Sequence, residues 1–346
     1  MHKYDYSFLK DKLSSNLVGA CNLIVELNAK ENIRKLQYED SFKALKNKAV
    51  IESVKASNAI EGIITTDARI KNIVNGAKPL NHNEQEIYGY KDALNIIHKN
   101  YKKIEFDENL ILSLHKTMEK ETGSKDAGKY KTKDNLIIEY DTDGNRNIRF
   151  TPVKAKETKK AMQQLMLAYY DARQDSNIID LFLIPCVIVD FLCVHPFFDG
   201  NGRISRLLTV LLLYQSGYDI GRYISIEKQI DKYKDNYYDA LKESSKLWHE
   251  NKNNYEPFIL FFLQIIYRCY KDLDDSFMEL SLKKAKKSER IEYILKESIV
   301  PISKLEISNK LPDVSIKTIE STLSKLLKEK KIKKIGSYKD ARYISN

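Results

Sequence analysis

Residues 195–206 read HPFFDGNGRISR, and the segment ahead of them, residues 178–194, reads IIDLFLIPCVIVDFLCV. The chain of 346 residues has only 12 glycines, yet two of them stand here within three positions, beside a histidine, an aspartate and two arginines. Pro185 and Asp190 interrupt the apolar run, which favours a buried core helix over a membrane span. A buried helix that ends in a dense polar cluster predicts a functional site at that end.

The polar cluster predicts a loop followed by a helix that can bind phosphate. His195 precedes a proline, and a residue in that position is pushed towards extended backbone, so His195 should leave the helix at the start of a loop. Gly200-Asn201-Gly202 permits a tight turn, and residues 204–215 predict a helix directly after it. The free backbone N–H groups of a helix N-terminus bind phosphate groups.

Three charged residues extend this interpretation to a nucleoside triphosphate. Asp199 supplies a carboxylate of the kind that binds Mg²⁺ together with phosphate oxygens. Arg203 and Arg206, three apart, are expected on the same side of the first helical turn, where they can bind further phosphates. Taken singly, each feature has an ordinary interpretation. A histidine after an apolar run is usually a core residue, a GNG sequence is a common turn, and an RxxR pair usually lies on a solvated face. Their combination in one short stretch favours the site.

Length and composition indicate a multi-domain globular chain. Its hydrophobic content is 42%, and 346 residues suggest two or three domains, since one core rarely grows past about 250–300 residues. The N-terminus lacks the profile of a secretory signal, and Cys21, Cys186, Cys193 and Cys269 have no CxxC spacing. We therefore expect a cytoplasmic protein without a zinc site or a membrane partner, in which Cys186 and Cys193 are buried.

Glycine and proline are scarce, and apolar residues recur at spacings of three and four positions, which predicts a mainly helical chain. One interruption, residues 136–152 (LIIEYDTDGNRNIRFTP), predicts a β-hairpin, because β-branched and aromatic residues flank Asp143-Gly144-Asn145. A helix with Asp107 as its N-cap is expected over residues 106–120, and another over residues 153–173.

The C-terminal fifth of the chain carries most of the positive charge. Residues 284–346 hold 16 Lys and Arg and 8 Asp and Glu, a balance of +8 within the +10 of the whole chain. A basic segment, residues 283–290 (KKAKKSER), separates this terminal unit from the helical body.

The terminal unit is predicted to contain three short helices and a hairpin. The helices are expected over residues 288–298, from the capping box Ser303-x-x-Glu306, and over residues 315–331, followed by two strands around Gly336-Ser337. This is winged helix-turn-helix order. The last helix should bury Ile316, Ile319, Leu323, Leu326 and Leu327. Its opposite side and the wing carry Lys317, Thr318, Ser321, Lys325, Lys333, Lys334, Lys339 and Arg342. Such a surface suits DNA phosphates, and it equally suits a solvated lysine-rich face or a protein-docking module.

The stretch HPFFDGNGRISR resembles the signature of Fic domains, HPFxDGNGRxxR, with every fixed position present. GKYKTKD and LIIEY ahead of it resemble the flap hairpin of that family, and residues 85–245 are expected to form the Fic core. The resemblance implies a mainly α fold, a Fic-type helical bundle with a β-hairpin flap, to which a winged helix is added. We divide the chain into an N-terminal helical region (1–84), the core (85–245), linking helices (246–285) and the winged helix (286–346).

The resemblance further implies transfer of AMP from ATP to a Tyr, Ser or Thr hydroxyl of a target protein, self-modification included. His195 would be the general base and Asp199 the Mg²⁺ ligand. Gly200, Asn201 and Gly202 would form the anion hole, with Arg203 near the β-phosphate and Arg206 at the γ-phosphate. Phe197 is expected to anchor the loop in the core. Tyr237 and Tyr238 lie where the family often lines its adenine pocket, although ordinary helix aromatics would have the same pattern.

A second motif, ASNAIEGI at residues 56–63, would alone be the end of a helix with Gly62 just beyond it. Beside a Fic core, Ser57-x-x-x-Glu61-Gly62 resembles the inhibitory motif of the family. A carboxylate that reaches Arg206 would neutralise the arginine intended for the γ-phosphate and repel that phosphate.

Other functions stay open at this point. The chain could be a DNA-binding regulator whose Fic domain senses nucleotide, or a Fic enzyme that removes AMP or transfers another phosphate-containing group. A homodimer would be one way to relieve the inhibition.

Overall fold

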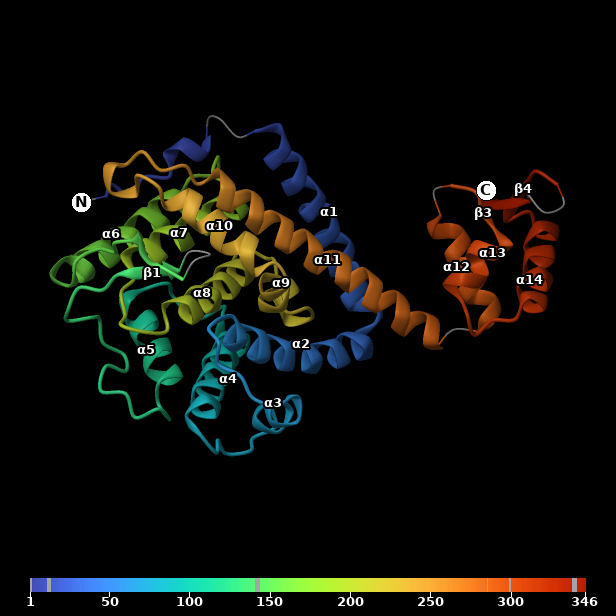
Figure 1. Ribbon diagram of the computed structural model, residues 1–346. Helices are drawn as coiled ribbons and strands as arrows, with labels where there is room; N and C mark the ends of the chain where they lie inside the picture. Colours follow the sequence, from blue (N-terminus) through green and yellow to red (C-terminus); the bar gives the residue numbers. More distant parts are fainter. Residues whose placement is uncertain (1, 11–13, 141–143, 285, 299, 338–340) are drawn as a thin grey trace. The chain divides into compact units, whose positions relative to one another are not determined.

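The computed structural model describes residues 2–10, 14–140, 144–284, 286–298, 300–337 and 341–346. Its backbone contacts divide the chain into two compact units, Met1–Leu273 and Asp274–Asn346. Most of the described residues are helical, as the sequence predicted (Figure 1). The finer boundaries expected at residues 84/85 and 245/246 stay predictions.

The first part of the larger unit consists of helices whose starts follow from local capping. Side-chain oxygens of Thr66, Asn81 and Asp107 each accept a backbone N–H bond at the start of the next helix, which satisfies a donor left free by the helix geometry. The N-cap predicted at Asp107 is thus confirmed. The elements are η1 (Ser7–Lys10), α1 (Ser15–Gln37), α2 (Glu39–Ile60), α3 (Asp67–Val74), α4 (His82–Asn100) and α5 (Glu108–Met118).

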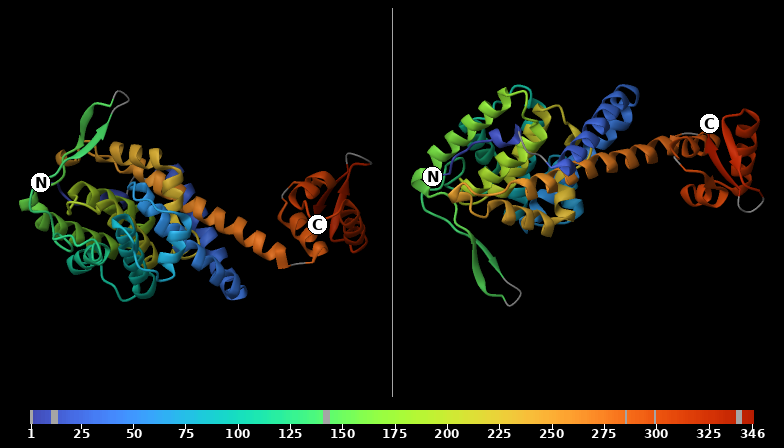
Figure 2. Two further views of the ribbon diagram at one scale, coloured as in Figure 1. Left: turned by 60° about the horizontal axis from the view of Figure 1, so that its bottom comes forward. Right: turned by 90° about the horizontal axis from the view of Figure 1, so that it is seen from above.

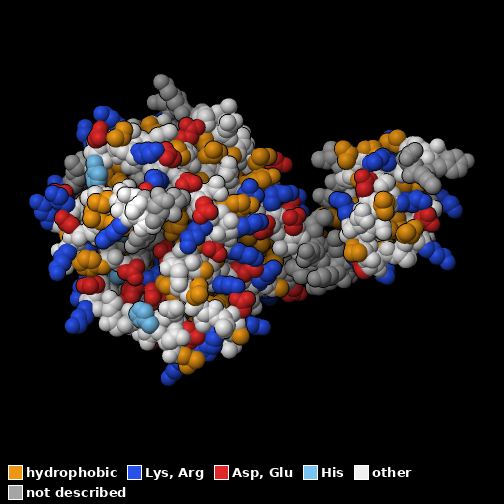
Figure 3. Space-filling model, viewed as in Figure 1, with side chains coloured by type: hydrophobic (Ala, Val, Ile, Leu, Met, Phe, Trp, Pro, Cys, Tyr) orange, Lys and Arg blue, Asp and Glu red, His pale blue; other side chains and the backbone are white. Residues whose placement is uncertain are grey.

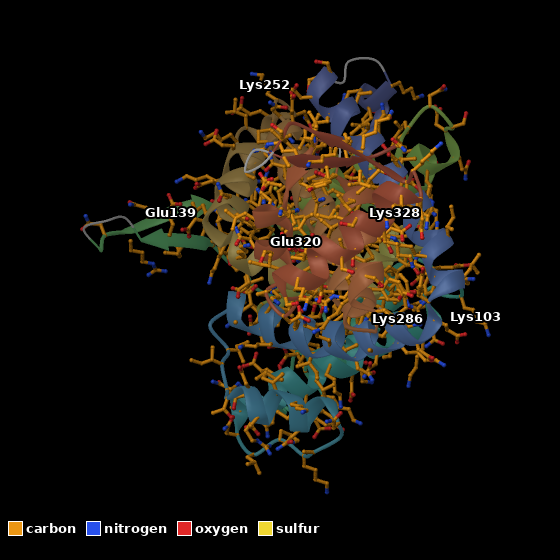
Figure 4. All side chains as sticks on the ribbon, turned by 90° about the vertical axis from the view of Figure 1, so that its right-hand side faces the viewer. Lys103, Glu139, Lys252, Lys286, Glu320 and Lys328 are labelled. Carbon is orange, nitrogen blue, oxygen red and sulfur yellow. The ribbon has the colours of Figure 1, made fainter. Side chains whose placement is uncertain are left out.

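The predicted hairpin is confirmed as β1 (Ile137–Tyr140) and β2 (Arg146–Phe150), which pair antiparallel with Ile138 opposite Ile148. It projects from the helical body (Figure 2), and Glu139 lies on the projecting part (Figure 4). Of the predicted turn, Asp143 lies outside the described residues, and Gly144 adopts a φ of 81° that favours glycine.

The buried helix α7 packs against α6, α8 and α10 in the rest of the larger unit. The elements here are α6 (Ala155–Gln174), α7 (Asp180–Val194), α8 (Asn201–Gln215), η2 (Ile220–Arg222), α9 (Ile226–Lys232), α10 (Lys234–Ser245), η3 (Trp248–Glu250) and α11 (Glu256–Lys284), the last of which continues into the C-terminal unit. Nearly all of α7 is buried, including Pro185, Cys186 and Cys193, as expected for a core helix. Among the described residues, no helix is both long enough and apolar enough to span a membrane. On the face that Figure 3 shows, charged side chains of both signs are interspersed with hydrophobic and uncharged ones.

A carboxylate in the middle of α7 ties three distant segments to the core. Asp190 is fully buried and accepts hydrogen bonds from Tyr6 Oη, Trp248 Nε1 and Tyr255 Oη, each at 2.7 Å. Burial raises the pKa of Asp190 to about 6, against the lowering effect of these donors. The polar interruption of the apolar run is therefore a structural anchor.

The C-terminal unit has its own core, and its three helices and final hairpin follow in the predicted order, with one short strand, β3, that was not predicted. It consists of α12 (Lys287–Glu297), β3 (Ile302–Ser303), α13 (Lys304–Lys310), α14 (Ile316–Lys328), β4 (Ile332–Ile335) and β5 (Arg342–Ser345). The strands form an antiparallel sheet in the order β3-β5-β4. The capping box of Ser303 and Glu306 is present. Ile319, Leu323 and Leu326 are buried as expected and Leu327 partly so, but Ile316 is 60% exposed. The prediction for Ile316 was wrong because it is the first residue of its helix, beside the N-cap Ser315, and stands outside the buried stripe.

We expect Asp190→Ala to lower the free energy of unfolding by about 2–4 kcal/mol, because three buried donors would lose their acceptor. The chain has one tryptophan, Trp248, which donates to Asp190, so urea unfolding followed by its fluorescence measures this directly. Asp171→Ala, at an exposed position on α6, is the control and should stay within about 0.5 kcal/mol of the unaltered protein. An Asp190 variant as stable as this control would contradict the anchoring role.

Candidate functional site

The site begins where α7 ends, at His195. Its backbone has φ 50° and ψ 63°, in the left-handed region, and its N–H donates to the Phe191 carbonyl at 2.9 Å. His195 therefore leaves the helix as predicted, but the expected extended backbone was wrong. The following proline disfavours a further helical residue, and a left-handed residue also ends a helix while retaining one hydrogen bond. For a residue other than glycine this backbone costs about 1–3 kcal/mol, so the surroundings must hold it.

Two buried side chains fix the loop after His195. The Asn201 Oδ1 accepts the Phe197 N–H at 2.9 Å, and its Nδ2 donates to the Phe197 carbonyl at 2.8 Å. The Phe197 ring is fully buried and stacks on His115 with ring centres 3.8 Å apart, which confirms its role as an anchor. His115 Nδ1 accepts the Gly128 N–H, so its Nε2 carries the proton and donates to the Asp199 carbonyl at 3.3 Å. The Asn201 side chain is thus engaged within the loop.

The first turn of α8 contains two glycines. Gly200 is the N-cap residue, and its φ of 79° favours glycine. A Cβ on Gly202 would meet Glu61 Oε1, at the end of the Glu61 side chain. The helix thus starts at the glycine turn as predicted, and a carboxylate from another helix lies directly over that turn.

That carboxylate binds Arg206, which is 2% exposed. Arg206 Nη2 donates to Glu61 Oε1 at 2.7 Å and to the Ser57 carbonyl at 2.9 Å, while its Nε donates to Ser57 Oγ at 2.9 Å. Burial alone would lower the pKa of Arg206, but the charges around it, Glu61 foremost, raise it overall. The residues of the second sequence motif are therefore in contact with the first motif.

The end of α2 places Glu61 at this point. Gly62 has φ 79°, its N–H donates to the Ala59 carbonyl, and the Ile63 N–H donates to the Asn58 carbonyl, both at 3.0 Å. This pair of bonds is a Schellman motif, and it confirms Gly62 as the residue after the helix end. Lys234, the first residue of α10, also donates from Nζ to the Ile60 carbonyl at 2.6 Å.

Arg203 lies in a different environment from Arg206. It is 1% exposed, with Nη1 2.7 Å from Glu86 Oε2 and Nη2 3.5 Å from Glu119 Oε1. Asp199 Oδ2 lies 3.6 Å from the same Nη2, and the Asp199 side chain is 85% exposed. Burial raises the pKa of Glu119, against the nearby Arg203 charge. The two arginines thus contact different carboxylates. Glu86 and Glu119 come from distant segments of the chain, so the RxxR spacing could not predict these contacts.

A cavity of about 480 Å³ joins most of the remaining predicted residues. Glu61, His195, Gly202, Arg206, Tyr237 and Tyr238 all line it. Tyr237 is buried, and burial raises the pKa values of both tyrosines. Both interpretations that the sequence allowed stay open, since the two tyrosines line the cavity while Tyr237 also packs against Phe258 and Phe261.

His195 reaches this cavity as a neutral ring. Burial, with a smaller contribution from the Lys131 charge, lowers its pKa to about 4. Its Nδ1 lies 3.3 Å from the Leu192 carbonyl oxygen, which assigns the proton to Nδ1 and leaves the Nε2 lone pair free to accept a proton. At neutral pH the ring is therefore unprotonated, and its Nε2 is able to accept a proton.

The hairpin forms part of the wall of the cavity, and its individual lining residues were not singled out in the sequence. They are Ile137, Ile138, Glu139, Arg149 and Phe150. Arg149 donates to the Tyr238 carbonyl at 3.0 Å, and Lys242 Nζ lies 2.7 Å from Glu139 Oε1, so both strands are joined to α10. The predicted hairpin ahead of the motif was the one sequence signal for this wall.

Comparison with known proteins gives one family. A model of the Fic/DOC family matches residues 105–213. A Fido domain-containing protein of Dictyostelium discoideum is 28% identical over 120 residues, which span 33% of this chain and 80% of that protein.

Solved structures share the fold. A Fic family protein from Desulfovibrio desulfuricans aligns over 97% of this chain and 98% of its own, with a TM-score of 0.64 and 17% identity. A Fic domain containing signaling protein from Bacteroides thetaiotaomicron aligns over 74% and 95%, with a TM-score of 0.57 and 20% identity. Fic-1 from C. elegans aligns over 77% and 72%, with a TM-score of 0.58 and 19% identity.

The sequence signature, the helical fold and these similarities agree. Residues 105–213 therefore form a domain of the Fic/DOC family.

Proposed function

We propose that this protein transfers AMP from ATP to a Tyr, Ser or Thr hydroxyl group of a protein, which can include the protein itself. One observation carries the proposal: the neutral His195 ring, Gly202 in the first turn of α8 and the Arg206 guanidinium line one cavity of about 480 Å³. A base beside an anion-binding helix N-terminus is the combination that phosphoryl-group transfer requires.

The residues present fit a bound triphosphate. Gly202 has no side chain to block approach to the first turn of α8, and Arg206 Nη1 is buried without a hydrogen-bond partner in the described part of the chain. Asp199, largely exposed, would bind Mg²⁺ as the single protein carboxylate beside phosphate oxygens. When bound, Mg²⁺ supplies positive charge that stabilises the transferring phosphates. Arg203 would assist near the β-phosphate, since its Nη2 already lies 3.6 Å from Asp199.

The proposed transfer uses His195 as the base. The target hydroxyl gives its proton to His195 Nε2, its oxygen bonds to the α-phosphorus, and the bond between that phosphorus and the bridging oxygen breaks to release pyrophosphate. Base catalysis of this type contributes about 10²- to 10⁴-fold. Tyr237 and Tyr238 would contact the adenine, and the hairpin would bring the target segment to the cavity.

Glu61 would inhibit this reaction. Its carboxylate lies over Gly202 and binds Arg206, where the γ-phosphate is proposed to bind. The negative charge repels that phosphate, so ATP would bind with its α-phosphorus out of line for attack. The same carboxylate could position a water for removal of AMP, and mass spectrometry of the products distinguishes addition, removal and transfer of another group.

The C-terminal unit supports a second candidate function, DNA binding. Lys317, Ser321 and Lys325 are exposed on α14, and Lys333 and Lys334 on the adjoining strand β4. The exposed lysines of α14 and those of the adjoining strand β4 could together contact DNA phosphates.

Glu61→Gly should raise AMP transfer at least about tenfold, because Arg206 and the glycine turn become available to phosphate. Glu61→Gln removes the negative charge but keeps the size of the side chain, and it should give part of the increase in AMP transfer. Incorporation of label from α-labelled ATP with Mg²⁺ into the protein measures both. Asp67→Asn, an exposed acidic position on α3, is the control for loss of one negative charge. Equal labelling in Glu61→Gly and in this control would remove Glu61 as an inhibitor.

His195→Ala, made in the Glu61→Gly protein, should reduce transfer by at least about 10²-fold, because the base proposed to accept the hydroxyl proton is lost. ATP affinity measured by calorimetry should change less than about twofold, since the phosphate-binding residues remain. Undiminished labelling would overturn the proposed mechanism.

The affinity for a 20-base-pair DNA duplex should fall steeply with salt, because phosphate contacts release counterions. Lys317→Ala should reduce the slope of log affinity against log salt by about one, whereas Lys296→Ala on α12 should leave it unchanged. Fluorescence anisotropy of labelled DNA with the full chain measures this. Absent or salt-independent binding would count against a DNA partner.

A further inference from the structure

The segment just before the hairpin binds the backbone on both sides of His195. The Lys131 N–H donates to the Pro196 carbonyl at 2.9 Å, and the Lys131 Nζ donates to the Val194 carbonyl at 3.1 Å. A single residue therefore holds the carbonyl oxygens immediately before and after the base.

Neighbouring residues continue this arrangement. The Lys131 Nζ also donates to Asn135 Oδ1 at 2.9 Å, and Asn135 Nδ2 donates to the Phe197 carbonyl at 3.3 Å. After the hairpin, the Val153 N–H donates to the Cys193 carbonyl at 3.3 Å. Both ends of the hairpin are thus hydrogen-bonded to the loop that contains His195.

The two ends are also joined to each other. Asp134 Oδ1 accepts the Ala155 N–H at 2.7 Å, across the base of the hairpin. The hairpin base and the catalytic loop are consequently one hydrogen-bonded assembly, and Lys131 makes the contacts closest to the base.

A lysine at this position is costly for folding alone. Lys131 is 3% exposed, and no described carboxylate lies within ion-pair distance of its Nζ. Burial lowers the pKa of Lys131 to about 8, with Asp134 acting weakly in the opposite direction. A buried ammonium without an ion-pair partner is normally replaced by an apolar side chain unless it has a task.

We propose that Lys131 is the positioning residue for His195: it fixes the carbonyls on either side of the base, maintains the left-handed backbone there, and so aims the ring into the cavity. The role in AMP transfer rests on the proposed function, whereas the control of His195 geometry and charge does not.

The charges around His195 make this role measurable. Lys131, Glu61 and Asp199 are the charged groups that act on the ring. Because the pKa of His195 lies near 4, below the usual 6.5, the ring stays neutral as the pH falls from 7 to about 5. Removing the Lys131 charge takes away one of the influences that lower the pKa of His195, and a looser loop would bury the ring less. We therefore expect the pKa of His195 to rise.

Three variants separate the role of the ammonium from that of bulk. Lys131→Met removes both Nζ bonds and keeps the backbone N–H and the chain length. Lys131→Arg keeps a cationic donor, so the pKa of His195 should stay close to that of the unaltered protein. Lys133→Met, at an exposed position in the same segment, is the matched control for the loss of one positive charge.

The first measurement is an NMR pH titration of the full chain with ¹³C-labelled histidine, in which the His195 signal is identified by its loss in His195→Ala. In Lys131→Met the pKa of His195 should rise by about one pH unit, while Lys131→Arg and Lys133→Met stay close to the unaltered protein. A Lys131→Met titration that matches Lys133→Met would overturn the proposal.

The second measurement is AMP transfer in the Glu61→Gly protein. Lys131→Met should lower kcat about tenfold or more and leave KM for ATP within about twofold, since the phosphate contacts lie elsewhere. If no variant transfers AMP, the proposed function fails, and the titration still decides the role of Lys131.

A folding defect in Lys131→Met does not prevent the test. Circular-dichroism melting identifies it, and Asn135→Ala then takes its place, because Asn135 is half-buried and accepts from Lys131 Nζ. That variant should raise the pKa of His195 in the same direction by a smaller amount. No change in Asn135→Ala would overturn the proposal in that case.

Discussion

The contact of Arg206 with Ser57 and Glu61 is the constraint on which the site depends. It joins α8, which starts the candidate phosphate site, to the end of α2, which lies well over a hundred residues earlier in the chain. A guanidinium that is 2% exposed must be paired, because a buried cation without partners is strongly unfavourable. In this structure the partner is a carboxylate from the same chain, at the position proposed for the γ-phosphate.

The loop between α7 and α8 shows how strain is maintained at a site. The left-handed backbone of His195 is unfavourable by itself, and it is surrounded by hydrogen bonds from three directions. Asn201 holds the Phe197 backbone from within the loop, His115 contacts the Asp199 carbonyl from α5, and Lys131 holds the carbonyls beside His195. Such redundancy holds the backbone of the loop in place, and the proposed proton transfer to His195 would require that fixed geometry.

Local chemistry made much of this structure predictable. The Asp107 cap, the capping box of Ser303 and Glu306, the hairpin and the helix end at Gly62 each depend on residues that are close in sequence. The carboxylates around Arg203 could not be predicted, because they come from α4 and from the residue after α5, and no local pattern encodes that meeting. The backbone of His195 was missed for a related reason: the proline rule excludes the helical region, and the tertiary hydrogen bonds select among the remaining ones.

The bond from Lys234 to the Ile60 carbonyl gives the start of α10 a double role. Lys234 holds the end of α2 one residue before Glu61, and Tyr237 and Tyr238 follow it within the next turn of the same helix. Lys234 therefore joins the end of α2 to the helix that carries both tyrosines. The segment proposed to inhibit and the residues proposed to contact the adenine thus share one hydrogen-bonded connection, through which a displacement of either would reach the other.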